Sequence, residues 1–387
     1  MTSASVVIVG GGILGASAAY HLAARGWKDL LVLDRGPLPG HGSTGRSTGG
    51  FRAQFATEIN VRLSLLSREK LQRFPGEIGV DSGYRPVGYL WLASTPGEME
   101  ILRAALKVQQ AAGLREAVEM SVREIERVQP HVLLEGLQGG AFCPADGFLR
   151  PMQVLEGYLA AARRLGVRVE WDTEVTDLEI GPGGRICRVL TTGEAVTCQA
   201  VVNAAGAWAA PLAAMAGLDL PVAPLKRQVA VTFPCTLLPA EMPMTIFVGD
   251  GFHLRVRDGR VLLLRPDPPG PGDPFDTSVD PAWIAKVTEA ARERLPILAG
   301  TEVDVPSCWA GLYEMSPDGH ALLGWAPDCE NLFLINGSSG HGVMHAPALG
   351  QLLSEILSDG AASSLDVSSL SPSRFAEGRP NAGPALL

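Results

Sequence analysis

The chain has 387 residues, of which 46% are hydrophobic and 19% charged, and its formal net charge is −9. This composition is typical of a globular enzyme with two associated domains and excludes a disordered or fibrous chain. The acidic balance also argues against a nucleic-acid-binding surface, which needs clustered Lys and Arg.

The spacing of the cysteines and the length of the apolar segments bear on metal binding and on the cellular location of the protein. The six cysteines are scattered without a Cys-x-x-Cys pair, so the spacing predicts neither a disulfide framework nor a zinc site, and the histidines show no metal-ligand spacing. The apolar N-terminus lacks a basic segment and is interrupted by Gly10 to Gly12, unlike a signal peptide. No later stretch approaches the ~20 apolar residues of a membrane span. We expect a soluble cytoplasmic protein without a metal site.

The N-terminal segment is typical of one β–α–β unit. Residues 6–9 are a short apolar, β-branched run, which predicts a strand buried on both faces of a parallel sheet. A glycine turn follows, and residues 16–25 predict a helix. Residues 30–33 predict a second buried strand that ends at Asp34.

The middle of the chain mixes helices with antiparallel strands. Helices are expected at residues 58–73 with a stop at Pro75-Gly76, and at 96–113, 121–128, 151–165 and 281–295. Strands are expected at 84–93, 167–178, 186–191, 196–204, 228–233, 244–248, 251–257 and 260–264. Asp250-Gly251 and Asp258-Gly259 are hairpin signals, and no crossover helices separate these last strands.

The C-terminal third returns to the first pattern. Residues 331–335 predict a buried strand, 337–342 a glycine-rich loop and 343–357 a helix. A nucleotide-binding domain built from both ends of the chain is thus interrupted by an antiparallel substrate domain. The tail from Arg379 onward is expected to be disordered.

The first glycine turn carries a dinucleotide-binding pattern. Residues 10–15 satisfy G-x-G-x-x-G directly after a strand and directly before a helix. Gly10 permits the tight turn, Gly12 lets the backbone approach a pyrophosphate, and Gly15 allows the helix to pack closely on the sheet. The start of the helix, with Ile13 and Leu14, presents N–H groups and positive dipole to phosphates.

An acidic residue completes this pattern. Asp34 lies nineteen residues after Gly15, at the end of the second strand, where a carboxylate can accept from ribose hydroxyls, and Arg35 follows it. The alternative is a glycine-rich turn with no ligand. The pattern alone does not distinguish NAD from FAD.

Three further small-residue segments bear on that choice. They are Ser43-Thr44-Gly45-Arg46-Ser47-Thr48-Gly49-Gly50-Phe51-Arg52, residues 201–208, and Gly337-Ser338-Ser339-Gly340-His341-Gly342. Together they resemble the D-amino-acid oxidase-like FAD superfamily, with sarcosine oxidases, glycine oxidase and proline dehydrogenase subunits, from Val6 to about Phe375. Residues 50–55 and 339–347 look closest to the β-subunit of dye-linked L-proline dehydrogenase and related sarcosine or hydroxyproline dehydrogenases.

The resemblance implies an α/β fold. A Rossmann-type FAD-binding domain of the glutathione-reductase-like variant would be interleaved with an antiparallel-sheet α+β substrate domain. The FAD-binding domain would comprise residues 1–83, 143–220 and 305–378, the substrate domain 84–142 and 221–304, and the disordered tail 379–387.

The resemblance also implies which residues would bind FAD beyond the first loop. Residues 43–50 would lie along the pyrophosphate and flavin, and Val175 would meet the adenine through its backbone. The remaining expected contacts are Ala205, Gly206, Trp208, Gly311, and the residues of the C-terminal loop and helix start, Gly337, Ser338, Ser339, Gly340, His341, Gly342, Val343 and Met344.

The C-terminal loop has a physical use in such a site. A helix N-terminus aimed at the flavin stabilises the negative charge that develops over N1 and the C2 carbonyl when hydride reaches N5. An ordinary tight turn is the alternative. Gly311 stands where monomeric sarcosine oxidases carry the cysteine that binds flavin covalently, so the expected FAD is non-covalent. Cys308 is offset by three residues, and we expect a buried structural thiol there.

Substrate binding mainly requires a carboxylate anchor, because an amine held over the ring can pass hydride from its α-carbon to N5. Arg52 is the first candidate, since it matches a carboxylate-binding arginine of sarcosine oxidases and a planar guanidinium suits bidentate recognition. The alternative is pairing with Glu58 or another surface acid. Tyr313, His253 and His341 are further candidates for the cavity, each with a purely structural alternative.

Two departures from the family pattern concern the electron acceptor. Met344 replaces a second, lysine anchor of monomeric sarcosine oxidase, and Arg265 only approximates the lysine that assists reaction with oxygen. Both favour a dehydrogenase, which would pass electrons to an acceptor protein or a sister subunit.

The leading hypothesis is therefore FAD-dependent oxidation of the C–N bond of a small secondary amino acid such as sarcosine, proline or hydroxyproline. A D-amino-acid or glycine oxidase is the second hypothesis. An FAD-binding assembly or interaction protein without turnover is the third.

Overall fold

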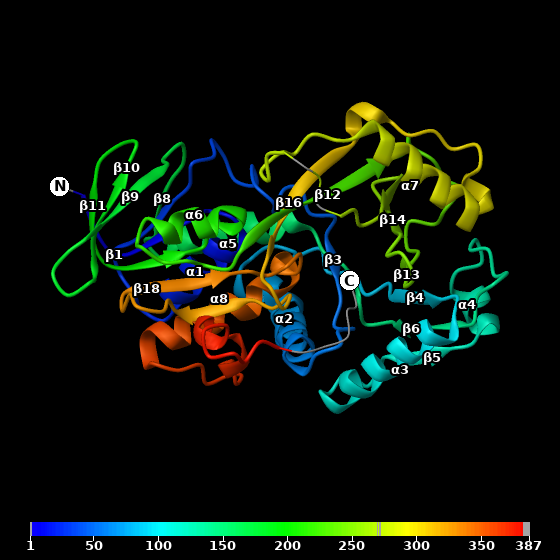
Figure 1. The fold of residues 1–387 in the computed structure, drawn as a ribbon, viewed down its shortest axis with the longest axis horizontal. Coiled ribbons are helices and arrows are strands. Elements are labelled where there is room, and N and C mark those ends of the chain that lie inside the picture. The colour runs from blue at the N-terminus through cyan, green and yellow to red at the C-terminus, as the bar shows by residue number, and fades with distance from the viewer. Residues whose placement is uncertain (1, 269, 271, 382–387) are drawn as a thin grey trace.

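The computed structural model describes residues 2–268, 270 and 272–381. Two eight-stranded sheets lie toward opposite ends of an elongated molecule (Figure 1). The first has the order β17-β18-β11-β1-β2-β8, and β10 and β9 extend from β11. Its strands are β1 (Thr2–Val9), β2 (Leu30–Leu33), β8 (Arg168–Glu170), β9 (Val175–Ile180), β10 (Ile186–Thr191), β11 (Val196–Asn203), β17 (Leu322–Trp325) and β18 (Leu332–Asn336).

The predicted β–α–β unit and its buried strands are confirmed. β1 pairs in parallel with β2 and β11, and β11 pairs in parallel with β18. Val6 and Ile8 of β1 belong to the core on the helix-covered face, whereas Val7 and Val9 belong to the core on the other face. Alternate residues of one apolar strand thus bury both faces of the sheet.

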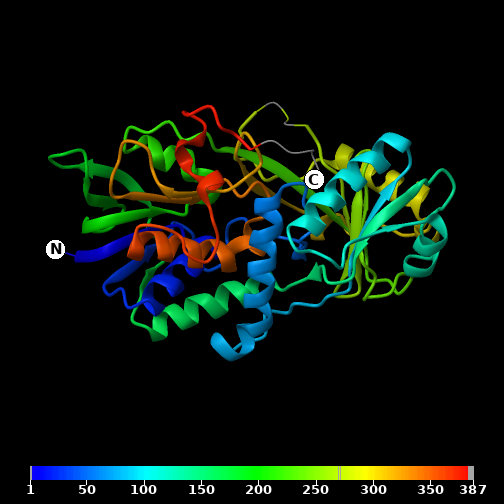
Figure 2. The same cartoon turned by 90° about the horizontal axis from the view of Figure 1, so that it is seen from below.

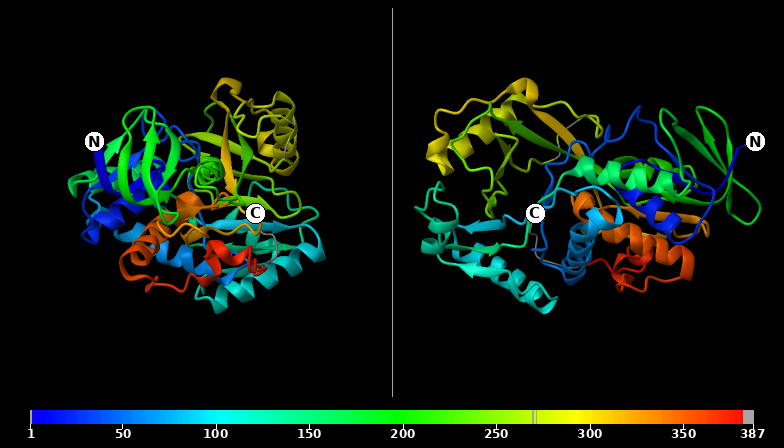
Figure 3. Two further views of the ribbon diagram at one scale, coloured as in Figure 1. Left: turned by 60° about the vertical axis from the view of Figure 1, so that its left-hand side comes forward. Right: turned by 180° about the vertical axis from the view of Figure 1, so that it is seen from behind.

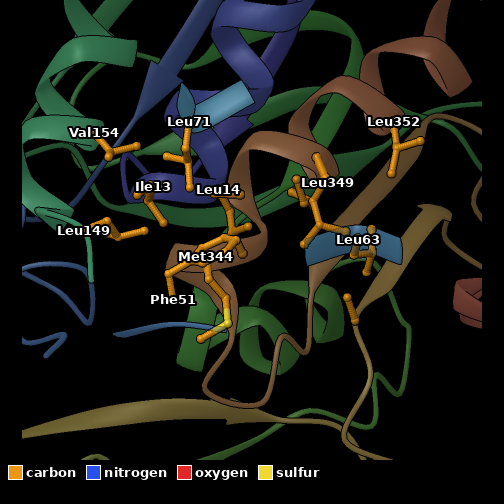
Figure 4. Packing of buried hydrophobic residues seen from close by; sticks show 14 of the residues in the cluster. Ile13, Leu14, Phe51, Leu63, Leu71, Leu149, Val154, Met344, Leu349 and Leu352 are labelled. Atoms are coloured by element: carbon orange, nitrogen blue, oxygen red, sulfur yellow. The ribbon is translucent and has the colours of Figure 1, made fainter. Parts of the chain in front are cut away.

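Four helices pack on the first of these faces and hold the site in place. They are α1 (Ile13–Ala24), α2 (Glu58–Glu77), α5 (Pro151–Arg164) and α8 (Gly342–Asp359), and α1 packs on both α5 and α8. The view in Figure 2 shows these helices together below the sheet. Figure 4 shows the apolar contact between them, with Leu14 of α1, Leu63 of α2, and Met344, Leu349 and Leu352 of α8 in one cluster.

The second sheet has the order β16-β12-β15-β14-β13-β4-β6-β5. Its strands are β4 (Tyr89–Ala93), β5 (Val118–Met120), β6 (Gly139–Cys143), β12 (Ala223–Val231), β13 (Met244–Phe247), β14 (His253–Arg257), β15 (Arg260–Leu264) and β16 (Trp309–Met315). The helices α3 (Pro96–Ala111), α4 (Val122–Val128) and α7 (Pro281–Arg294) accompany it (Figure 3). A small sheet of β3 (Gly50–Phe51) and β7 (Gly147–Phe148) and the short α6 (Ala209–Ala214) complete the main elements.

The second sheet is mostly antiparallel, as expected, with one exception. β4 and β13 run parallel, with Leu90 opposite Thr245. Strands so far apart in sequence can pair in either direction. The hairpin signals around β13 therefore did not predict how β13 would pair with β4. The predicted Asp258-Gly259 turn between β14 and β15 is confirmed, because both residues have positive φ, at 53° and 73°.

Three predicted boundaries are wrong. α2 continues through Pro75 to Glu77, because the Oγ of Ser82 donates to the carbonyl oxygen of Leu71 and replaces the bond that a proline cannot give. The strand predicted at 167–178 is divided into β8 and β9, with Asp172 at positive φ between them. The strand predicted at 84–93 begins only at Tyr89.

The C-terminal segment returns to the middle of the molecule. Arg374 is fully buried and donates to both carboxylate oxygens of Asp318, at 2.8 Å each. The backbone and side-chain nitrogens of Asn381 donate to the same carboxylate. Residues 382–387 of the tail expected to be disordered lie outside the described residues. Among the helices of the described residues, none has both the length and the apolar character needed to cross a membrane.

The packing of α8 on α1 is close enough to require glycine at position 350. A Cβ at Gly350 would lie 2.2 Å from Ser17 Oγ and 2.7 Å from the Ser17 carbonyl carbon. We expect Gly350→Ala to lower the free energy of unfolding by about 1–3 kcal/mol through overpacking, measured by denaturant unfolding. Gly76→Ala in α2 is the control, since a Cβ there meets nothing within 4 Å. Equal stability of the two variants would contradict this interpretation.

Candidate active site

A cavity of about 1140 Å³ extends between the first sheet and the second. Loops at the ends of β1, β2 and β11 line one side of it, the segment before β3 and the start of α8 line another, and β4, β12, β14 and β16 close it from the second sheet. The cavity therefore lies between the two sheets, where loops from the N-terminal and C-terminal parts of the chain meet.

The first glycine loop forms one end of the cavity. A Cβ at Gly10 would lie 2.2 Å from the carbonyl oxygen of Ala204, and one at Gly15 would lie 1.9 Å from the carbonyl oxygen of Gly10. Both glycines are thus required by the protein's own packing. Gly12 differs, because its Cβ would meet only Thr44 Oγ1, at 3.5 Å, and Gly12 lines the cavity. Its missing side chain leaves space for a ligand.

The acid after β2 is held by the backbone around it. One oxygen of Asp34 accepts from the N–H of Gly11 at 2.6 Å, and the other accepts from the N–H of Gly36 at 2.7 Å. Arg35 lies over the ring of Trp208, with its Cζ 4.0 Å from the ring centre. With Val175, these side chains line the same end of the cavity.

The segment at residues 43–50 runs along the cavity and is tied to both sheets. Thr44 Oγ1 accepts from the N–H of Ile13 at 3.1 Å. From β14, Arg255 donates to the carbonyl oxygen of Thr48 at 2.7 Å and Arg257 donates to that of Ser47 at 3.2 Å. Burial lowers the pKa of Arg255 to about 9. Its guanidinium lies over the ring of Phe148 in β7. The second sheet therefore fixes the backbone of this segment.

The C-terminal glycine loop forms the opposite end. His341 is the N-cap of α8 and makes no side-chain capping hydrogen bond. A Cβ at Gly340, whose φ is 90°, would lie 2.4 Å from the ring of Tyr313. Glycine at 340 therefore allows the Tyr313 ring to lie directly against the loop.

Glu314 is a buried carboxyl group beside this loop that the sequence did not single out. Its Oε1 accepts from the N–H of Ser338 at 3.3 Å, and its backbone carbonyl accepts from the N–H of Ser339 at 2.9 Å. Its Oε2 is buried without a partner in the described residues. Burial raises the pKa of Glu314 to about 7. This carboxyl group fixes the loop and is partly protonated near neutral pH.

Arg52 is buried and points its guanidinium toward the cavity. Its Nη1 donates to the carbonyl oxygen of Gln54 at 2.6 Å, and its Nη2 lies 3.3 Å from His341 Nε2. Its Cζ lies 4.0 Å and 5.2 Å from the ring centres of Phe55 and Trp91. The alternative partner Glu58 pairs instead with Arg62, at 2.6 Å.

No carboxylate in the described part of the chain forms an ion pair with Arg52. Burial lowers the pKa of Arg52 to about 10, well above neutral pH, so it remains a cation. The nearby Asp146 accepts instead from the N–H groups of Ala53 and Gln54, and burial raises the pKa of Asp146 to about 7. Asp146 holds the backbone next to Arg52 and leaves the guanidinium available to a ligand.

The other predicted substrate residues also reach the cavity. Tyr313 and His253 line it from β16 and β14. The ring of His341 packs edge-on against Phe55, with ring centres 4.7 Å apart. The Nε2 of His341 must accept from Arg52, because a guanidinium can only donate. The Nδ1 of His253 contacts the carbonyl oxygen of Gly251 at 2.8 Å, and burial lowers the pKa of His253 to about 4.

Most of the predicted cofactor residues lie on the cavity wall. Four glycines do not: Gly15, Gly45, Gly49 and Gly337. Each lies just behind the wall, where a Cβ would meet protein atoms within 2.6 Å. These four glycines shape the backbone of the loops.

Among the cavity residues that were missed, three stand out because their strands gave no motif. Tyr89 and Trp91 alternate on β4 toward the cavity, and Arg227 reaches it from β12. The alternation of Tyr89 and Trp91 was visible in the sequence, but the sequence did not show which face of the strand would line a cavity. Among the described residues, no cysteine lines the cavity. Cys308 instead accepts from the N–H of Val231 at 3.4 Å and packs against the core of the second sheet.

The arrangement fits a dinucleotide with a ring system at its far end. α1 and α8 both begin at the cavity, and neither N-cap residue, Gly12 or His341, provides a side-chain cap. Such helix starts bind phosphate or other developing negative charge. The start of α1 follows the glycine loop that begins at Gly10, and the start of α8 lies beside the residues predicted to bind the substrate. Groups of three or more His, Cys, Asp or Glu residues that could hold a metal were not found in the described residues.

Comparison with known proteins agrees with this geometry. The family model described as FAD dependent oxidoreductase, DAO, matches residues 5–356. FAD-dependent oxidoreductase domain-containing protein 1 of Xenopus laevis is 30% identical over 96% of this chain and 82% of its own. Mitochondrial dimethylglycine dehydrogenase of Rattus norvegicus is also 30% identical over 96% of this chain, which spans only 45% of that enzyme.

A solved structure shows the same architecture. The L-proline dehydrogenase from P. horikoshii superposes with a TM-score of 0.90, covers 98% of this chain and 100% of its own, and is 27% identical. The predicted fold class, with a Rossmann-type FAD-binding part interleaved with a mostly antiparallel second part, is therefore confirmed.

Gly12 allows ligand binding to be separated from folding. Gly12→Val places a branched side chain in the cavity, where φ of −71° accommodates it. We expect the variant to lose most of its bound FAD, measured by visible flavin absorbance, while the free energy of unfolding of the FAD-free protein changes by less than about 1 kcal/mol. Gly15→Val is the contrast, because its clash with Gly10 should destabilise the fold itself. Full FAD content in Gly12→Val would refute the placement.

The low pKa of His253 makes stability depend on pH in a defined direction. The unfolded chain binds a proton at His253 near pH 6.5, whereas the folded protein does so only near pH 4. Its contribution to stability is therefore complete above about 6.5 and decreases as the pH falls toward 4. We expect the melting temperature of the wild type to fall more steeply over this range than that of His253→Gln. Parallel curves would show that His253 does not contribute.

Proposed function

Since the chain belongs to the DAO family of FAD-dependent oxidoreductases, which oxidise amino acids and amines, we propose that it oxidises the C–N bond of a small secondary amino acid. Sarcosine, proline and hydroxyproline are the first candidates. The observation that carries the proposal is Arg52, a buried guanidinium without a carboxylate partner in the described residues, at the end of the cavity where α8 begins.

Arg52 would bind the carboxylate of the substrate. A guanidinium already fixed by Gln54, Phe55 and Trp91 keeps its position before the substrate arrives, so little side-chain entropy is lost on binding. A buried cation without an ion-pair partner also gains more from a carboxylate than an exposed one does. Tyr313 and His253 would bound the substrate on the side of the second sheet.

When bound, FAD would supply the oxidant, which takes up the hydride from the α-carbon and leaves the substrate as an iminium ion. The protein's part is to position the groups. The loop of residues 10–15 would hold the pyrophosphate, Asp34 the ribose, Val175 the adenine, and residues 43–50 and 337–344 the flavin. The start of α8 stabilises negative charge at its N–H groups.

We further propose that FAD is bound non-covalently and that electrons pass to an acceptor other than oxygen. The first proposal is supported by Gly311, which lines the cavity without any cysteine beside it in the described residues. The second is supported by Met344 and by Arg265, which lines the cavity but pairs with Asp250 at 3.0 Å. An acceptor protein or a sister subunit is the expected partner.

The division of the chain into an FAD-binding part (1–83, 143–220 and 305–378) and a substrate part (84–142 and 221–304) is also proposed. The separate membership of most strands in two sheets supports it, with β16 as the strand that the second sheet takes from the third segment. A cytoplasmic location is supported by the cysteines, all of which are free thiols.

Replacement of Arg52 tests the proposed anchor. We expect Arg52→Ala to lower kcat/KM for the best secondary amino acid by roughly a hundredfold or more, mainly through KM, while FAD content is unchanged. Arg52→Lys should recover only part of the loss, because it lacks the bidentate geometry. Arg62→Ala is the matched control, since Arg62 is exposed and pairs with Glu58.

The substrate panel decides between the alternatives. Anaerobic mixing of the purified holoprotein with sarcosine, proline, hydroxyproline, glycine and D-alanine should bleach the flavin with the secondary amines. Bleaching only by D-alanine or glycine would favour the D-amino-acid or glycine oxidase. Failure of all amines would favour the non-catalytic FAD-binding protein. Loss of FAD in Arg52→Ala would show that Arg52 binds the flavin instead.

A further inference from the structure

A second arginine lines the same cavity from the opposite side. Arg227 lies on β12 of the second sheet, whereas Arg52 follows β3. Arg227 is half-buried, and no carboxylate in the described residues forms an ion pair with it. The proposed amine oxidation needs only one carboxylate anchor, so Arg227 has no part in it.

Arg227 retains hydrogen-bond donors for a ligand. Its Nη1 donates to the carbonyl oxygens of Lys226, at 3.2 Å, and Asp267, at 2.9 Å. No hydrogen bond from its Nε or Nη2 to a described residue is present. The closest acid is Asp267, whose Oδ2 accepts from Gln228 at 3.0 Å. Burial lowers the pKa of Arg227 despite Asp267, so a further anion would be stabilised there.

The two guanidinium groups face one space. In the pairing of β12 with β16, Arg227 stands opposite Gly311 and Leu225 opposite Tyr313, which places Arg227 diagonally from Tyr313 on one face. The Cζ of Arg227 lies 5.7 Å from the ring centre of Tyr313. The charges of Arg52 and Arg227 both lower the pKa of Tyr313 against the effect of burial, and both lower that of His253. Tyr313 and His253 thus lie near both cations on the cavity wall.

No acid of the described residues forms an ion pair with either arginine, although Asp146 lies near Arg52 and Asp267 near Arg227. Asp250, the acid near His253, pairs with Arg265 and Arg294, at 3.0 Å each. Glu314 is bound to the backbone of the loop after β18. The substrate end of the cavity thus presents two cations, with an aromatic ring and a neutral histidine near both.

We propose that the substrate is a secondary amine with two carboxylates, of which Arg52 binds the one next to the oxidised carbon and Arg227 the distal one. This inference rests on the proposed amine oxidation and narrows its substrate class. The reaction itself is unchanged: the α C–H bond breaks, its hydrogen would leave with both electrons to FAD, and the nitrogen lone pair forms the C=N bond of an iminium ion.

Three achiral amines test the proposal on the purified holoenzyme. Iminodiacetate carries both carboxylates, N-(carbamoylmethyl)glycine replaces one by an amide of the same size, and sarcosine lacks it. We expect kcat/KM with an artificial electron acceptor to be at least tenfold higher for iminodiacetate than for either monocarboxylate, which is the effect of one charge-assisted hydrogen-bonded pair. Arg227→Met should reduce this ratio to near one, and Arg227→Lys should retain part of it.

Binding without turnover gives an independent readout. Thiodiacetate and (methylthio)acetate have sulfur in place of the amine, so their affinities can be measured by perturbation of the flavin spectrum or by calorimetry. We expect thiodiacetate to bind at least tenfold more tightly to the wild type, and this preference to disappear in Arg227→Met. Lys226→Met is the control, because Lys226 lies next to Arg227 but pairs with Asp276; its ratios should equal those of the wild type.

The outcomes separate this inference from the function on which it rests. Oxidation of sarcosine or proline with no preference for iminodiacetate would overturn the role of Arg227 and leave the amine oxidation intact. An equal loss for all three amines in Arg227→Met would likewise show that Arg227 only supports the fold. Failure of every amine to reduce the flavin would overturn both.

Discussion

Two helices whose N-cap residues provide no side-chain cap begin at the same cavity, and the rest of the structure serves this arrangement. The N-termini of α1 and α8 present N–H groups and positive dipole to the space between them. Thr44 accepts from the first N–H group of α1 and Glu314 from the loop before α8, and the remaining N–H groups of the two helix starts favour a ligand with negative charge near each of them. The glycines behind the loops, the close contact at Gly350, and the parallel strands all fix where these two helix starts point.

Features encoded by short segments could be predicted from the sequence. The glycine pattern at residues 10–15, the acid at Asp34 and the second glycine loop at 337–342 each combine residues close in sequence, and all three meet at the cavity. Arg52 was found because it ends such a segment. The buried strands were found because a strand covered on both faces must be apolar throughout, which leaves a visible run of Val, Ile and Leu.

What could not be predicted depends on contacts between distant strands. Arg227 faces Tyr313 only because β12 and β16 pair in one particular register, and a shift by one residue would place Arg227 on the other face. The parallel pairing of β4 with β13 likewise left no local pattern, and with it Tyr89 and Trp91 went unnoticed. The helix was predicted to stop at Pro75. It continues because Ser82, a residue outside the helix, donates the hydrogen bond that Pro75 cannot give.

β14 has a consequence for attempts to widen the substrate range. This one strand carries His253, which lines the cavity, and also Arg255 and Arg257, which grip the carbonyls of Thr48 and Ser47 across from it. Two hydrogen bonds therefore fix the distance between this strand and the wall formed by the segment at residues 43–50. A redesign for bulkier amines that keeps these hydrogen bonds would shorten side chains on the strands themselves, such as Leu264 of β15.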